Sequence, residues 1–297
     1  NNMKKNILVI GGSGFLGSHV SDALTESGFN VTIYDNKNSK WIQNKQKFIL
    51  GDILDQKKIN SAIKKNRIVF NFAGIADLDE AYSNPIDVTK YNVLANNLIL
   101  DSCKSNKIEK YIFASSVYVH GKFGGFYKTS KKCCELFIKN YFDTFNLNYL
   151  ILQFGTLYGD RSNLKNGIHN YLSQALKNKK IKYNGSKESI RNYINVKDAA
   201  KVCVELLEKK LANKTYIITG NEERKITDTF RLIEEILGKK IHITYNKPKN
   251  KNHYDISPYS IDYDTPIKYS INKSIDFGFG IHRLINQIRK NEKNNNF

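Results

Sequence analysis

Short apolar runs alternate with amphipathic stretches along the first half of the chain. Residues 5–10 are apolar without polar alternation, a pattern typical of a strand buried on both faces of a parallel sheet. Similar runs lie at residues 31–34, 48–50, 68–72, 111–114 and 148–154. Helical patterns separate them, at residues 14–27, 56–65, 88–105 and 129–146. This alternation predicts an α/β fold, a doubly wound parallel sheet with helices on both faces.

The rhythm loosens after about residue 156, where Asn, Gly and Lys cluster between shorter elements. Helical patterns there cover residues 170–178, 198–209, 227–237 and 281–290, and strand patterns cover 190–196, 216–218 and 240–245. Residues 247–270 are loop-rich, and the tail 291–297 is expected to be disordered. We therefore expect a first domain at 1–155 and a smaller C-terminal α/β domain at 156–297, parts of which, near 190–210, return to the first.

Composition limits the class of protein. With 297 residues, 40% of them hydrophobic, the chain can bury a large core. Its apolar runs stay well short of the roughly 18 residues that a membrane span needs, so we expect a cytoplasmic protein without a membrane partner. The four cysteines have no C-x-x-C spacing and the histidines no H-x-x-x-H pair, so we expect neither a metal site nor a disulfide framework.

The net charge of +19 raises the question of nucleic-acid binding. Most of this charge comes from Lys residues dispersed singly among Asn and Ile, without a basic arm or an Arg/aromatic stripe. We therefore expect no nucleic-acid partner. A positive field would still help to capture an anionic substrate.

A glycine-rich turn follows the first strand. Gly11, Gly14 and Gly17 stand in a G-x-x-G-x-x-G pattern between that strand and a helix. Backbone without side chains lets a pyrophosphate approach the helix N-terminus, whose free amides and dipole favour negative charge. The context predicts a Rossmann-type dinucleotide site.

The end of the second strand indicates which dinucleotide is bound. Asp35 can accept hydrogen bonds from both ribose hydroxyls and would repel a 2′-phosphate, which favours NAD over NADP. Lys37 and Lys40 are counter-evidence, because a basic residue there could bind that extra phosphate.

Two further strand ends reach the same edge of the sheet. Asp52 and Ile53 follow the third strand, where they would meet the adenine or form a plain solvated turn. Phe72, Ala73 and Gly74 end the fourth strand, where small residues let the backbone run close to the cofactor.

The candidate chemistry lies farther along the chain. Tyr127 and Lys131 form a Tyr-x-x-x-Lys pair on one face of a helix. Tyr127 stands eleven residues after Ser116. A phenol titrates near 10, so it needs the positive charges of Lys131 and of an oxidised nicotinamide to act as a base at neutral pH. Tyr127 would take a hydroxyl proton while hydride leaves the same carbon, with Ser116 orienting the hydroxyl and Lys131 holding the cofactor ribose.

These motifs resemble the extended short-chain dehydrogenase/reductase family, in particular the NAD-dependent nucleotide-sugar epimerases and dehydratases typified by UDP-galactose 4-epimerase. The resemblance covers nearly the whole chain. Besides the motifs above it includes residues 91–93, 157–161 and 191–198, the last resembling R-D-[FY]-[IV]-x-V-x-D.

The resemblance implies roles for these positions. Domain 1–155 would be the NAD-binding Rossmann domain and 156–297 mainly the substrate-binding domain. Cofactor contacts would come from Gly11, Gly14, Phe15, Leu16, Gly17, Asp35, Asn36, Asn38, Ser39, Asp52, Ile53, Phe72, Ala73, Gly74, Asn92, Tyr127 and Lys131. Asn92 would support the active-site backbone, Thr156 and Ser116 would meet the substrate, and Arg191 would contact the diphosphate of a UDP- or GDP-linked sugar. The family also implies a homodimer formed by two long helices per subunit.

Two departures from the family pattern narrow the reaction. Val117 and Tyr118 follow Ser116 where 4,6-dehydratases carry Asp-Glu, so dehydration is disfavoured. The segment from Ser116 to Tyr127 is shorter than in typical epimerases, which weakens the case for an ordinary epimerase. The sequence thus predicts oxidation of a ring carbon, C4, giving a keto sugar that is either released or reduced again. A catalytically silent NAD-binding regulator of the same fold is the alternative.

Overall fold

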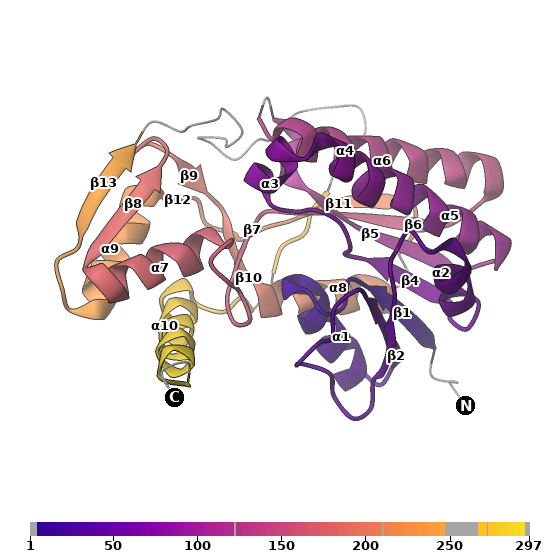
Figure 1. Ribbon diagram of the computed structural model, residues 1–297, viewed down its shortest axis with the longest axis horizontal. Helices are drawn as coiled ribbons and strands as arrows, with labels where there is room; N and C mark the ends of the chain where they lie inside the picture. The colour runs from indigo at the N-terminus through magenta and orange to yellow at the C-terminus, as the bar shows by residue number, and fades with distance from the viewer. Residues whose placement is uncertain (1–4, 122, 210, 247–266, 272, 295–297) are drawn as a thin grey trace.

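The computed structural model describes residues 5–121, 123–209, 211–246, 267–271 and 273–294. Two lobes make up the molecule (Figure 1). The larger lobe is built on one sheet flanked by helices, and the smaller lobe carries short strands and three helices. Within the described residues, no helix is both long enough and apolar enough to cross a membrane.

The sheet of the larger lobe has eight strands, all pairing in parallel, in the order β14-β11-β6-β5-β4-β1-β2-β3. In chain order the strands are β1 (Asn6–Ile10), β2 (Asn30–Asp35), β3 (Lys47–Leu50), β4 (Ile68–Asn71), β5 (Lys110–Ser116), β6 (Tyr149–Phe154), β11 (Lys214–Ile218) and β14 (Ile267–Lys268). The order reverses between β1 and β4. In open parallel sheets, ligands bind at the carboxyl ends of the strands at such a reversal. The predicted doubly wound α/β architecture is confirmed.

Helices cover both faces of this sheet. One face carries α1 (Phe15–Glu26) and α8 (Val196–Glu208), and the other carries α2 (Gln56–Ile63), α5 (Ala95–Ser105) and α6 (Gly125–Phe145). Residues of β1 alternate between these two cores: Ile7 and Val9 face the first, Leu8 and Ile10 the second. Burial on both faces explains why the central strands read as unbroken apolar runs.

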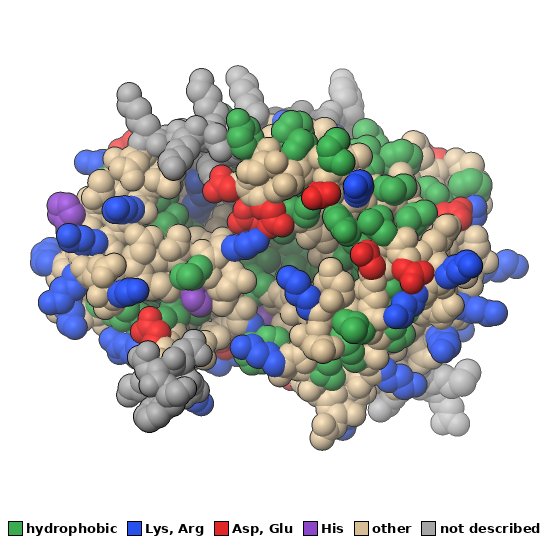
Figure 2. Space-filling model, in the orientation of Figure 1, with side chains coloured by type: hydrophobic (Ala, Val, Ile, Leu, Met, Phe, Trp, Pro, Cys, Tyr) green, Lys and Arg blue, Asp and Glu red, His purple; other side chains and the backbone are tan. Residues whose placement is uncertain are grey.

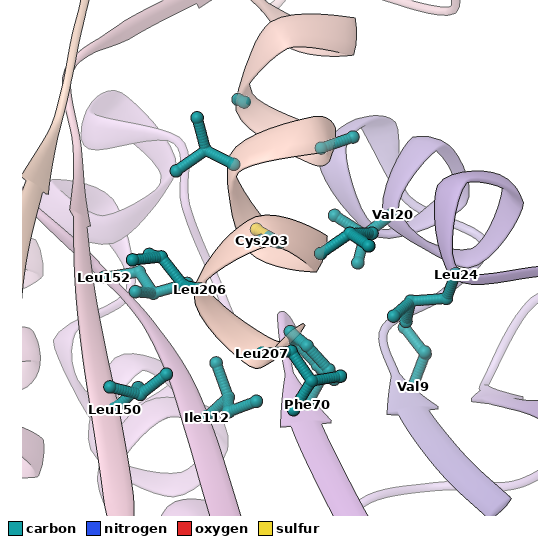
Figure 3. Packing of buried hydrophobic residues seen from close by; sticks show 14 of the residues in the cluster. Val9, Val20, Leu24, Phe70, Ile112, Leu150, Leu152, Cys203, Leu206 and Leu207 are labelled. Carbon is teal, nitrogen blue, oxygen red and sulfur yellow. The ribbon is translucent and has the colours of Figure 1, made fainter. Parts of the chain in front are cut away.

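Figure 3 shows the packing on the α1/α8 face. Cys203, Leu206 and Leu207 of α8 point toward the sheet, where they meet side chains from the strands. The labelled strand residues in contact with this layer are Val9, Phe70, Ile112, Leu150 and Leu152. Although α8 follows residue 156, it therefore completes the core of the larger lobe, as do strands β11 and β14.

The smaller lobe has a core of its own around Tyr158, Leu172 and Phe230. Its elements are β8 (Lys180–Asn184) paired with β13 (His242–Asn246), β9 (Ile190–Arg191) paired with β12 (Arg224–Lys225), and helices α7 (Gly167–Asn178), α9 (Ile226–Leu237) and α10 (Phe277–Asn294). Strands β7 (Thr156–Tyr158) and β10 (Tyr193–Asn195) pair where the chain passes between the lobes (Figure 1).

Three local expectations differ from the structure. The expected helix at 88–105 begins as α4 (Pro85–Val88) and passes through a π-helical segment, η1 (Thr89–Leu94), before α5. The expected strand at 190–196 divides into β9 and β10 around a buried Asn192. The expected disorder from 291 is wrong for residues 291–294, because α10 continues to Asn294. Residues 247–266 of the expected loop region lie outside the described residues.

Candidate functional site

The turn between β1 and α1 requires its glycines. Gly11 has φ +77°, and a Cβ there would lie 2.7 Å from the backbone nitrogen of Ala73. A Cβ on Gly17 would lie 2.2 Å from the carbonyl oxygen of Gly11. Gly14 stands at the N-cap of α1 without any side-chain cap, so the first amides of this helix have no intrahelical or side-chain acceptor. These free donors suit a pyrophosphate.

Asp35 is held in place at the carboxyl end of β2. Its Oδ2 accepts a hydrogen bond from the Ser13 backbone nitrogen at 3.0 Å, and its Oδ1 accepts one from that of Lys37 at 3.0 Å. A carboxylate oxygen has more than one lone pair, so both oxygens can still accept from ribose hydroxyls. Lys37 and Lys40 line the same cleft, which is the arrangement that the sequence left open.

A cavity of about 750 Å³ follows the carboxyl ends of β1, β2 and β4. Figure 2 shows a hollow between the two lobes, bordered by acidic side chains on one side and basic ones on the other. The predicted cofactor residues that line the cavity are Gly11, Gly14, Asp35, Asn36, Asn38, Ser39, Ile53, Phe72, Ala73 and Gly74. A cleft with free helix amides and a fixed carboxylate fits NAD.

Asp52, Leu16 and Phe15 are not part of this wall. The side chain of Asp52 accepts from the Leu54 nitrogen at 2.9 Å, so it stabilises its own turn. Leu16 packs against the hydrophobic core, while Phe15 stands edge-to-face with His19. The structure does not place these side chains, or Gly17, among the residues that line the cavity.

Asn92 connects the cavity wall to α6. Its Oδ1 accepts from the Ile75 nitrogen at 2.7 Å, and its Nδ2 donates to the Ile75 carbonyl at 3.0 Å and to the Ser130 hydroxyl at 2.9 Å. Because Asn92 is buried, these bonds are shielded from water. They fix the backbone that follows β4 against the helix that carries Tyr127 and Lys131.

The structure brings Ser116, Tyr127 and Lys131 together. Ser116 ends β5, its Oγ accepts a hydrogen bond from the Tyr118 backbone nitrogen at 3.3 Å, and its hydroxyl lies beside the phenol of Tyr127. The Nζ of Lys131 donates to the Ala114 carbonyl at 2.8 Å and lies 5.8 Å from the centre of the Tyr127 ring. All three side chains are buried, and Tyr127 packs in a small cluster with Ile75, which lines the cavity. The trio therefore stands directly behind the cavity wall.

Burial controls the protonation of this trio. It raises the pKa of Tyr127 to about 12, and the neighbouring Ser116 hydroxyl opposes this only in part. Burial also lowers the pKa of Lys131, against the attraction of the neighbouring Cys134 and Glu135 groups. The phenol is thus protonated at neutral pH, and an added positive charge beside it would favour the phenolate.

The predicted substrate residues lie outside the cavity. Thr156 is on β7, and Arg191 is on β9, where its Nη1 donates to the Ile190 carbonyl at 3.0 Å. Neither residue is among those that line the cavity.

Several residues at the rim of the cavity could not be identified from the sequence motifs. Trp41 lines the cavity. The guanidinium carbon of Arg161 lies over its ring, 4.8 Å from the ring centre. Lys165 reaches across to Glu80 with a 2.5 Å ion pair. A D-x-x-E pattern at residues 77–80 was available as a helix-start signal, and Asp77 does cap α3 (Leu78–Ser83). The two partners of the ion pair stand 85 residues apart, so no local pattern could reveal it.

Comparison with known proteins agrees with this geometry. Residues 7–219 match the model of the NAD dependent epimerase/dehydratase family. A Methanocaldococcus jannaschii protein provisionally named a UDP-glucose 4-epimerase is 29% identical, with 97% of this chain and 99% of that protein covered. The structure of a Methanobrevibacter ruminantium UDP-N-acetylglucosamine 4-epimerase in complex with UDP-N-acetylmuramic acid has a TM-score of 0.84 at 25% identity, over 97% of this chain and 100% of that one. The structure of a Thermus thermophilus UDP-glucose 4-epimerase in complex with NAD has a TM-score of 0.82 at 20% identity. The match covers 96% of this chain and 99% of that one.

Proposed function

Since this chain belongs to the NAD-dependent epimerase/dehydratase family, we propose that it oxidises a nucleotide-activated sugar at a ring carbon, C4. The 4-keto sugar is then either reduced again on its other face, as in a 4-epimerase, or released, as in a C4 dehydrogenase or ketoreductase. The observation that carries this proposal is the buried Ser116, Tyr127 and Lys131 trio behind the wall of the dinucleotide cleft.

Each member of the trio has one task. NAD, when bound, supplies the hydride acceptor. Tyr127 takes the proton of the sugar hydroxyl, and Ser116, whose hydroxyl lies beside the phenol, holds that hydroxyl in line. Lys131 supplies a fixed positive charge that favours the phenolate. The glycine turn and Asp35 hold the cofactor.

A UDP- or GDP-linked sugar is the proposed substrate. The net charge of +19 attracts an anionic diphosphate, and relatives named above act on or bind UDP-sugars. Arg191 is proposed to contact the diphosphate and Thr156 the sugar. Arg191 lies in the smaller lobe and Thr156 where the chain passes between the lobes, so this assignment requires the substrate to extend from the trio toward β7 and β9.

The residues after Ser116 support a reaction without dehydration. Val117 is buried and apolar, and the ring of Tyr118 stands edge-to-face on Tyr127 at 6.2 Å between centroids. Neither side chain can act as a carboxylic acid or carboxylate base at neutral pH. A 4,6-dehydratase would need such a pair at this place.

A panel of UDP-glucose, UDP-N-acetylglucosamine, UDP-glucuronic acid and GDP-mannose tests the proposal. Product epimers are followed by NMR, and enzyme-bound NADH by absorbance. At least one sugar should be turned over, and Tyr127→Phe should lower its turnover by about a hundredfold or more, because the proton acceptor is lost. Tyr141→Phe, on the same helix, is the matched control. A wild-type protein that binds NAD but turns over neither UDP- nor GDP-sugars would instead support the regulatory alternative.

A further inference from the structure

Helix α6 carries a further buried polar residue, Glu135, one turn beyond Lys131. Only 4% of its surface is exposed. Its Oε1 accepts hydrogen bonds from the Ser115 hydroxyl at 2.5 Å and from the Gln153 amide at 2.9 Å. The ion pairs found among the described residues do not include Glu135. Burying a carboxylate in this way is costly unless its charge serves a neighbour.

The hydrogen bonds of Glu135 join the segments that carry the trio. Ser115 precedes Ser116 at the end of β5, and Gln153 lies beside it on the paired strand β6. The Oε1 of Gln153 in turn accepts from the Nε2 of His120 at 2.6 Å. The network therefore connects α6, β5, β6 and the short 3₁₀ helix η2 (Val117–His120).

Glu135 and Lys131 are both buried and stand four residues apart on α6, a spacing that places two side chains on one face of a helix. The groups facing Lys131 from β5 are the Phe113 ring, 4.7 Å from Nζ, and the Ala114 carbonyl, and neither titrates. On α6 its titratable neighbours are Tyr127, Cys134 and Glu135. Burial raises the pKa values of Tyr127 and of the Cys134 thiol to about 12, so both are neutral at pH 7. Of these neighbours, Glu135 is the carboxyl group, and it stands one helical turn from Lys131.

We infer that Glu135 is a positioning residue: its charge keeps Lys131 protonated, and its bond to Ser115 fixes the end of β5 against α6. Lys131 stabilises the tyrosinate only while it is charged, so Glu135 sets the upper pH limit of the site. The role of the trio in catalysis rests on the proposed function, whereas the effect of Glu135 on Lys131 does not.

The titration of Lys131 tests this inference without any substrate. NMR of protein labelled at the lysine ε-carbon, with NAD present, follows the Lys131 signal, which is assigned by its loss in Lys131→Arg. Glu135→Gln keeps the shape of the side chain and removes the charge, so the pKa of Lys131 should fall by about one unit or more. Ser115→Ala and Glu135→Asp keep the charge, and the pKa should stay within about half a unit of the wild-type value. An equal pKa in wild type and Glu135→Gln would overturn the inference.

Activity provides a second readout that a purely structural role would not move. Lysine is charged below its pKa, so a lower pKa brings the loss of charge to lower pH. The alkaline limb of kcat in Glu135→Gln should therefore move to lower pH by the same shift as the NMR titration, with KM for the sugar nucleotide within about twofold of wild type. A uniform loss at every pH, with the limb unmoved, contradicts the inference. If Glu135→Gln does not fold, Ser115→Ala still separates the charge from the hydrogen bond. A fall of about one unit in the pKa of Lys131 in Ser115→Ala would show that the hydrogen bond, not the charge, is responsible, and would overturn the inference.

Discussion

At the residue scale, we propose that the two oxygens of Asp35 select the cofactor. Both already accept backbone hydrogen bonds, which orient the carboxylate toward the cleft. Asp35→Ser removes the charged acceptor and leaves Lys37 and Lys40 along the same wall. The Kd for NAD should rise by about tenfold or more, since hydrogen bonds to a charged group contribute about 1.5–3 kcal/mol each. Binding of NADP should improve at the same time.

Trp41 offers a direct measurement, because it is the one tryptophan of the chain and lines the cleft. Its fluorescence is titrated with NAD and with NADP in wild type and in Asp35→Ser. Asp143→Ser changes an exposed aspartate on α6 and is the control. An unchanged ratio of the two Kd values would contradict the role of Asp35.

The pH dependence of sugar oxidation also belongs to the residue scale. Tyr127 must lose its proton to act as a base, and burial raises its pKa to about 12. A base with a raised pKa is active above that pKa and inactive below it, so oxidation should increase toward alkaline pH until Lys131 loses its charge. Lys131→Met removes the charge, raises the pKa of Tyr127 further, and should move the acid limb to higher pH. The positive charge of bound oxidised NAD favours the phenolate and brings the acid limb to lower pH, so single-turnover formation of NADH between about pH 6 and pH 10 measures both limbs. An acid limb at the same pH in Lys131→Met would show that Lys131 does not act through its charge.

At the scale of elements, the β1–α1 turn separates two roles of glycine. A Cβ at position 17 would collide with the Gly11 carbonyl at 2.2 Å, so Gly17→Ala forces α1 away from β1. It should lower the free energy of unfolding by about 2 kcal/mol or more, as overpacking does, and weaken NAD binding. At position 14 a Cβ would lie 3.3 Å from the same oxygen. Gly14→Ala should therefore weaken NAD binding at a smaller cost in stability. Urea unfolding and NAD titration give both quantities, and equal losses of stability would contradict this distinction.

Elements buried on both faces were the ones that the sequence predicted well. Strands β1 and β4 are continuous apolar runs because helices cover both sides, so their pattern does not depend on distant contacts. Strand β8 exposes alternate residues and begins in a lysine cluster, which reads as a loop. The π-helical η1 depends on the backbone shift that places buried Asn92 against Ile75 and Ser130, and no local propensity encodes that shift.

The candidate site follows the same rule. The glycine turn, Asp35 and the Tyr127/Lys131 pair are recognised by short spacings along the chain, so the sequence alone could suggest them. Glu135 could not be identified in this way. One turn after Lys131 on a helix, it is indistinguishable in sequence from a solvated glutamate, and its burial arises from contacts with β5 and β6.

At the scale of the molecule, the cleft between the two lobes lies at the point where the strand order of the sheet reverses. That placement could be predicted from the alternation of strands and helices, because it depends on chain order alone. The rim could not, since the Lys165–Glu80 ion pair joins the two lobes across the cleft.

An apolar surface on the larger lobe supports the expected homodimer. Phe126, Leu136 and Phe137 of α6 are exposed by 47%, 55% and 38%, and Leu94 of η1, which packs against α6, is exposed by 48%. Figure 2 shows hydrophobic side chains gathered over α4, α5 and α6. Contiguous apolar surface of this kind marks an interface, and two antiparallel helix pairs can cover one another about a twofold axis.

We therefore propose that a second copy of this chain packs on this face, and the double substitution Leu136→Glu with Phe137→Glu tests it. Sedimentation velocity should show a dimer for wild type and a monomer for the variant, because two buried charges without partners cost more than such an interface recovers. Phe279→Glu, at a side chain 56% exposed on α10, is the matched control and should remain dimeric. A monomeric wild type at micromolar concentration would refute the proposal. The trio and the cleft are formed within one chain, so the monomeric variant should still bind NAD.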